Sequence, residues 1–263
     1  MTKLSLDLIT VALGPAREKS RFTYLNFYGE KVDIPYIVWR VNGTGKNILI
    51  DAGCSAEDYY RVIKGQSAAQ FAAGGESFKD VQDVTRFEDG LAEWGLTPED
   101  IDVVLVTHLH WDHVINLTKC TNARIIVQEA EWDAALNPHP LAKFAYAPRW
   151  FYEQLKNVEF VSGDLEFLPG IQLIHTPGHT PGGQTVAIET DNGWYAVTGY
   201  CAIKDNFYPP EEVQKRTGYR VIPAAVHTDA IAAFDSSLKL LERFGPNILP
   251  SHEQTLMAVK HIP

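Results

Sequence analysis

The chain has 263 residues, and its 33 acidic and 23 basic side chains give a formal net charge of −10. Hydrophobic residues make up 45% of it and charged residues 21%, which excludes a disordered or fibrous protein. The acidic balance argues against a nucleic-acid binder or a protein that docks on anionic membranes, because such surfaces are usually basic. Three cysteines are too few for a disulfide framework, which favours a reducing compartment.

No segment resembles an export signal, and no run approaches the roughly 18 apolar residues of a membrane span. We therefore expect a cytoplasmic protein that does not enter a membrane. The length fits one domain over residues 1–263, because α/β domains of roughly 200–250 residues are common.

The first half of the chain predicts strands, turns and two helices. Residues 4–13 alternate between apolar and polar side chains, and the apolar runs 35–41 and 47–50 flank a Gly-rich turn, as in a β-hairpin. The remaining predicted elements are helices over 85–95 and 129–136 and buried strands over 101–106 and 125–127. The patterns of 55–81 and 137–155 are irregular, so we expect a helix-and-loop insertion in the former and a cap over a site in the latter.

The second half predicts further strands and one long helix. Apolar runs bounded by Gly, Asp or Pro predict strands over 158–161, 171–174, 185–188, 194–198 and 248–250. The amphipathic pattern of 228–244 predicts a helix, and it ends at Gly-Pro. Strand–helix alternation in both halves favours an α/β fold with two sheets packed face to face and helices outside.

Metal-ligand side chains gather in the segment His108-Leu-His110-Trp-Asp112-His113, directly after a predicted buried strand. Loops at strand ends frequently carry functional residues. Histidine and aspartate suit zinc, iron or manganese. Four such side chains within six residues are hard to explain as packing, so the segment predicts a metal site.

This segment resembles the His-x-His-x-Asp-His motif of the metallo-β-lactamase superfamily. Other motifs of that family follow in the same order over roughly 35–255, around Asp51, His179 and His252. The region of 162–185 is similar to acyl-homoserine lactonases. The resemblance implies a four-layer αβ/βα sandwich with a metal site at one edge of the two sheets.

Carried over residue by residue, the resemblance implies two metal ions, with zinc expected and iron or manganese as alternatives. His108, His110 and His179 would hold one ion, and Asp112, His113 and His252 the other. Asp51 would support the site from behind.

The chain departs from the family at its fourth motif, where a bridging aspartate normally follows an apolar strand. Counting from His179 without a gap places Cys201 at that position, in the context Gly199-Tyr-Cys201. A thiolate is a good zinc ligand, so we expect Cys201 to bind the second metal. The alternative is an apolar cysteine that is simply buried at a strand end.

A second departure concerns the tyrosine that the lactonases use in catalysis. Lys204 stands at its position here, and we expect Tyr200 to replace it, with Tyr208 and Tyr219 as alternatives. Asp112 is expected to pass a proton to the leaving group, in addition to binding metal.

The resemblance implies a metal-dependent hydrolase in which metal-bound hydroxide attacks a lactone or related ester of a small molecule. One alternative is an amide or thioester hydrolase, including one that acts on β-lactam-like substrates. Another is a metal-binding scaffold with altered or lost activity. The expected partner is a small-molecule substrate, and the aromatic-rich segment 137–155 could also form a homodimer contact.

Overall fold

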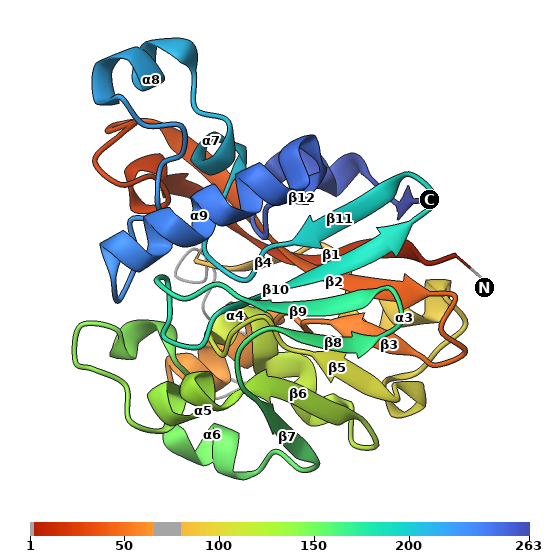
Figure 1. Cartoon of the computed structure of the whole chain (residues 1–263). Helices are drawn as coiled ribbons and strands as arrows, with labels where there is room; N and C mark the ends of the chain where they lie inside the picture. Colours follow the sequence, from red (N-terminus) through yellow and green to blue (C-terminus); the bar gives the residue numbers. More distant parts are fainter. Residues whose placement is uncertain (1–2, 66–79) are drawn as a thin grey trace.

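The structure is a computed structural model that describes residues 3–65 and 80–263. Part of the predicted insertion at 55–81 therefore lies outside the described residues. Two β-sheets pack face to face, and helices cover their outer sides (Figure 1). The four-layer αβ/βα arrangement predicted for the chain is thereby confirmed.

The first sheet contains eight of the described strands. Along the sheet their order is β13 (His261–Ile262), β1 (Ser5–Glu18), β2 (Lys31–Asn42), β3 (Ile48–Ile50), β5 (Val103–Leu105), β6 (Arg124–Gln128) and β7 (Val158–Val161), while β4 (Gln82–Asp83) pairs with β1. β2 and β3 pair antiparallel, which confirms the predicted hairpin. From β3 to β7 the pairing is parallel, so the carboxyl ends of these strands meet at one edge.

The second sheet contains five strands in the described part of the chain. Their order is β12 (Ile248–Leu249), β11 (Gly193–Val197), β10 (Gln184–Thr190), β9 (Ile171–His175) and β8 (Leu165–Leu168). The strand predicted over 158–161 belongs to the first sheet, as β7, although it is close in sequence to the strands of the second. β8 had no counterpart in the sequence prediction.

Helices and short turns connect the strands. The α-helices are α1 (Ala56–Asp58), α3 (Phe87–Glu93), α4 (Trp111–Val114), α5 (Glu129–Leu136), α6 (Arg149–Glu153), α7 (Lys204–Phe207), α8 (Glu211–Thr217) and α9 (Ala230–Phe244). A π-helical turn, η2 (Tyr59–Ile63), follows α1, and among the 3-10 turns are η1 (Lys19–Arg21) and η6 (Lys143–Ala145). α5 and α9 confirm the helices predicted over 129–136 and 228–244. In the described residues, no helix has the length and hydropathy needed to cross a membrane.

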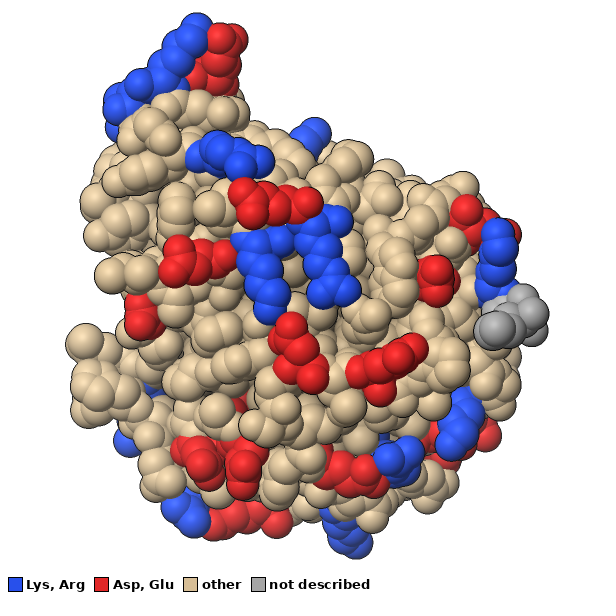
Figure 2. Space-filling view, in the orientation of Figure 1, with Lys and Arg blue, Asp and Glu red and all other residues tan. Residues whose placement is uncertain are grey.

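Alternation along the strands separates the core into two parts. On β5, Val103 and Leu105 belong to the cluster between the sheets, where they meet Leu173 and Val186 of the second sheet. Val104 points the other way, into the cluster beneath the outer helices. This period of two is what a strand buried on both faces requires. On the face seen in Figure 2, acidic and basic side chains are interspersed, and neither sign forms a continuous field.

Candidate metal centre

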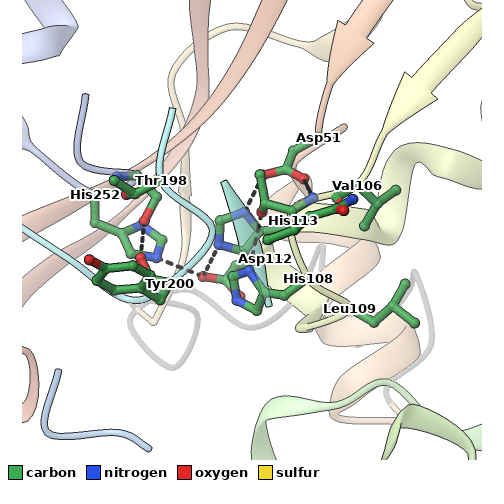
Figure 3. A network of polar contacts seen from close by, with 12 residues as sticks. Asp51, Val106, His108, Leu109, Asp112, His113, Thr198, Tyr200 and His252 are labelled. Atoms are coloured by element: carbon green, nitrogen blue, oxygen red, sulfur yellow. Dashed lines mark hydrogen bonds and ion pairs between the residues drawn. The ribbon is translucent and has the colours of Figure 1, made fainter. Parts of the chain in front are cut away.

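The predicted ligands come together where the strand ends of both sheets meet. His108 and His110 lie in the loop after β5, and Asp112 and His113 lie on the short helix α4 that follows. His179 comes from the loop between β9 and β10, and His252 follows β12. Residues far apart in sequence thus reach one edge of the sandwich (Figure 3).

Two groups of ligand atoms result. His108, His110 and His179 form the first group, and Asp112, His113 and His252 form the second. Within each group the ligand atoms lie within 4.8 Å of one another. Asp112 lies at the centre of Figure 3, and its Oδ2 is 3.7 Å from Nε2 of His113 and 3.4 Å from Nε2 of His252. These two groups contain the same six side chains that the resemblance assigned to two metal ions.

Hydrogen bonds on the far side of three imidazole rings determine which nitrogen faces the centre. Nδ1 of His179 donates to the Val226 carbonyl (2.5 Å), and Nδ1 of His252 donates to the Pro35 carbonyl (2.9 Å). Because a carbonyl oxygen only accepts, both rings carry hydrogen on Nδ1 and leave the Nε2 lone pair free. Nε2 of His179 is buried without a hydrogen-bond partner, which fits a metal ligand.

Asp51 fixes the third ring in the same way. It follows β3, is buried, and accepts hydrogen bonds from the backbone N–H and the hydroxyl of Thr107, both at 2.7 Å. Its Oδ2 also lies 2.7 Å from Nδ1 of His113, whose Nε2 is buried and makes no hydrogen bond. A carboxylate behind a histidine orients the ring and makes it a stronger ligand. The predicted supporting position of Asp51 agrees with these contacts.

The protonation states of the first ligand group suit a metal site, whereas the pKa of His113 is shifted in the opposite direction. Burial, together with the neighbouring imidazoles, lowers the pKa of His108 and His110 well below the ordinary value. Burial lowers the pKa of His179 to about 4. For His113, burial also lowers the pKa, but the carboxylates of Asp112 and Asp51 outweigh it and the net pKa is raised. Imidazoles that stay neutral at pH 7 keep a lone pair for a metal ion.

Glu131 of α5 was missed by sequence analysis, although it holds both loops of the first group. Its Oε1 accepts from the Leu109 N–H (2.9 Å), between His108 and His110 in the chain, and its Oε2 accepts from the Gly182 N–H (3.1 Å). Its side chain is fully buried. Burial raises the pKa of this carboxyl, against the lowering effect of its hydrogen bonds. No local sequence signal marks Glu131, because its partners are 22 and 51 residues away.

Gly182 allows the loop that carries His179 to lie directly against the backbone of Glu131. A Cβ atom at Gly182 would lie 2.1 Å from the backbone nitrogen of Glu131, far inside van der Waals contact. A side chain at this position would push the start of α5 away from the loop that carries His179. The first glycine of the segment Thr180-Pro-Gly-Gly183 is therefore required by packing.

Cys201 lies after β11 and is nearly buried. It lines a cavity of 360 Å³ together with His108, His110, Asp112, His179 and His252. Burial raises the pKa of its thiol, and the charge of Asp112 raises it further. Cys201 belongs to neither of the two ligand groups among the described residues, but it shares their cavity.

The side chain of Tyr200, the predicted catalytic tyrosine, points away from the cavity that Cys201 lines. Its hydroxyl donates to the Ser237 hydroxyl of α9 (3.1 Å), and Tyr200 is not among the described residues that line the cavity. The Tyr200 side chain packs against α9 and points away from the cavity. This position does not support the predicted catalytic role. Tyr208 also points elsewhere, since its hydroxyl donates to the Gly245 carbonyl.

Tyr36 on β2 is one of the tyrosines that border the ligand groups. It lines the same cavity, and its ring packs edge-on against Trp111 and His252, with centroid distances of 5.6 and 6.1 Å. No hydrogen bond of its hydroxyl exists within the described residues. Burial and the charge of Asp112 raise the pKa of Tyr36 well above the ordinary value, so it stays protonated as a donor. Its sequence context is an ordinary buried strand, which gave no sign of this position.

The protein is an αβ/βα sandwich with two histidine-rich groups at one edge, an arrangement that is consistent with a dinuclear metal site. The metallo-β-lactamase superfamily model matches residues 35–248, and the chain belongs to that superfamily. Within it, the chain falls in the branch of the N-acyl homoserine lactonase AiiA.

Curated relatives and solved structures agree on this branch. An N-acyl homoserine lactonase from Bacillus sp is 33% identical over 165 residues, which is 62% of each chain. One from Bacillus cereus is 30% identical over 68% of this chain and 69% of its own. The crystal structure of a B. thuringiensis AiiA mutant with N-decanoyl-L-homoserine bound has a TM-score of 0.72 at 26% identity, covering 97% of this chain and 95% of that one. The part of this chain that aligns with the Bacillus sp lactonase thus covers 62% of the length of that relative.

Proposed function

We propose that this protein is a metal-dependent hydrolase that opens a lactone or a related ester of a small molecule, with zinc at both ligand groups. The observation that carries the proposal is that five of the six side chains of the two groups, all but His113, line one 360 Å³ cavity. Buried Nε2 atoms without hydrogen-bond partners support occupancy by metal. When bound, two divalent ions polarise a carbonyl and supply a nucleophile from water at neutral pH.

The reaction adds one water across the acyl carbon–oxygen bond. That bond breaks, the acyl carbon gains a hydroxyl group, and a proton must reach the leaving alkoxide. Asp112 is placed for this transfer, because its carboxylate lies between His113 and His252 and also borders the cavity. Tyr36, with a protonated hydroxyl at the cavity wall, is placed to donate a hydrogen bond to the substrate.

Cys201 is proposed as a further ligand of the second ion. Its thiol lies in the same cavity as Asp112 and His252, and it follows the strand end at which the family's acid stands. Bound zinc would lower the pKa of the thiol and stabilise its thiolate, which burial otherwise disfavours. A thiolate ligand also favours zinc over manganese.

The relatives support lactone hydrolysis as the reaction class, but they do not identify the particular lactone that this chain hydrolyses. Those compared are N-acyl homoserine lactonases, and one solved structure contains the product N-hexanoyl-L-homoserine at the catalytic metal centre. In this chain Lys204 stands where the resemblance places their catalytic tyrosine. We therefore propose the reaction class, and leave the acyl-homoserine lactones as one member of the substrate panel.

The test is to load the purified chain with zinc and measure hydrolysis of an acyl-homoserine lactone, a simple lactone, an aryl ester, a thioester and a β-lactam. We expect turnover of a lactone or an ester and its loss in His179→Ala. The matched control is His175→Ala, which removes a partly buried histidine four residues away whose Nε2 contacts the Pro181 carbonyl. Activity confined to the thioester would overturn the lactone proposal, and metal binding without any turnover would favour the scaffold alternative.

A further inference from the structure

The cavity beside the ligand groups has a cationic wall, which is unexpected in a chain with a net charge of −10. Arg17, Arg21 and Lys64 all line it, against the carboxylates of Asp80 and Asp112. Since Asp112 belongs to the second ligand group, the rest of the wall carries an excess of positive charge.

Two of these cations already have a carboxylate partner. Nη1 of Arg17 lies 3.7 Å from Oδ1 of Asp80, and Nζ of Lys64 lies 3.5 Å from its Oδ2. Arg17 also donates to the Asp80 backbone carbonyl. One acid therefore serves both side chains and orients them along the wall.

Arg21 is different, because it has no hydrogen bond or ion pair with any described residue. It ends η1, where its neighbour Lys19 is paired with Asp205 (2.8 Å) and Glu30 (3.1 Å). The next residue, Phe22, packs edge-on against the ring of His252, with a centroid distance of 6.3 Å. This contact holds the backbone of Arg21 beside the second ligand group, and the Arg21 side chain lines the same cavity as Cys201.

A second cavity, of 540 Å³, adjoins the first and shares five lining residues with it, among them His110 and His179. The part of its lining that is not shared includes the apolar side chains of Leu141, Ala142 and Ala225. The first ligand group therefore lies where a cationic cavity meets a more apolar one. A substrate that spans both would be charged at one end only.

We propose that the substrate is an ester or lactone that carries a carboxylate, and that Arg21 binds this carboxylate while the apolar part occupies the second cavity. The guanidinium group suits the task, since it can bind a carboxylate through two parallel hydrogen bonds. Arg17 and Lys64, already paired with Asp80, add long-range attraction. The inference rests on the proposed hydrolase function, and it makes Arg21 a specificity-determining residue.

The test compares two chromogenic esters that differ only in charge, mono-4-nitrophenyl adipate and its methyl ester. For the zinc-loaded wild type we expect kcat/KM to favour the carboxylate ester. In Arg21→Met the ratio of the two kcat/KM values should fall about tenfold or more, the usual effect of losing a charge-assisted hydrogen bond, with partial recovery in Arg21→Lys. Arg86→Met is the matched control, because Arg86 is exposed on the surface and lines neither cavity.

Calorimetric binding of adipate to the same proteins gives a readout without turnover, and Arg21→Met should weaken it. If both esters are hydrolysed with a ratio that Arg21→Met leaves unchanged, the inference is wrong and the proposed function stands. If the zinc-loaded chain hydrolyses neither ester nor any member of the panel, the proposed function is wrong. Adipate binding that depends on Arg21 would still support the anion site in that case.

Discussion

Glu131 connects the two loops that carry the first ligand group, and a glutamine in its place isolates this role. The carboxylate accepts from the Leu109 N–H at one oxygen and from the Gly182 N–H at the other, at 2.9 and 3.1 Å. Glutamine keeps the size of the side chain but replaces one oxygen with an NH₂ group. In either orientation of the amide, one of the two backbone N–H groups therefore faces a donor.

The magnitude follows from the burial of these groups. Glu131 is fully buried, so the N–H group left without an acceptor has no access to water. Such a group costs about 1–3 kcal/mol, and we expect the free energy of unfolding of the metal-free protein to fall by about 2 kcal/mol. Since the same loops carry His108, His110 and His179, zinc affinity should fall as well, by about tenfold or more.

The assay is denaturant unfolding at pH 7 in the presence of a chelator, followed by zinc titration against a competing chromophoric chelator. Glu129→Gln is the matched control, because Glu129 begins the same helix and is exposed. Its free energy of unfolding should stay within about 0.5 kcal/mol of the wild type. The reasoning is refuted if Glu131→Gln matches the wild type in both its denaturant midpoint and its zinc affinity.

Three further predictions concern other residues. Cys201→Ala should lower the zinc content measured by mass spectrometry from two ions per chain to one, and an unchanged content would contradict the ligand proposal. Tyr36→Phe should lower kcat for ester hydrolysis about tenfold or more, whereas Tyr200→Phe should change it by less than about twofold; the opposite ranking would restore the catalytic role predicted for Tyr200. For Asp58, burial raises the pKa, but hydrogen bonds from Arg61 and Ser55 outweigh it and the net pKa lies below the ordinary 3.8. The stability that Asp58 contributes is therefore present above pH 3.8 and is lost as the pH falls through the folded-state pKa. Asp58→Asn should lower the free energy of unfolding by about 1 kcal/mol at pH 6, measured by denaturant unfolding, and by less at pH 3. An equal loss of stability at both pH values would count against the ion-pair explanation.

The ligand motif was readable from the sequence because its spacing is local. His108, His110, Asp112 and His113 follow one buried strand, and a strand end places neighbouring side chains at the same sheet edge whatever the rest of the fold does. The distant ligand His252 was found through the order of family motifs, and the structure brings it to the same edge. The helix α9 was predictable for a similar reason, since its amphipathic periodicity and its end at Gly-Pro lie within the segment itself.

The sequence by itself predicted the sandwich and the six histidine and aspartate side chains that form the two groups, because these depend on short spacings or on motif order. Only the tertiary structure decided which side chains surround them. Tyr200 is turned to Ser237 on α9, and Tyr36 borders the cavity in its place. Glu131 reaches across to loops 22 and 51 residues away. Such positions depend on how distant segments pack, which no pattern within one segment records.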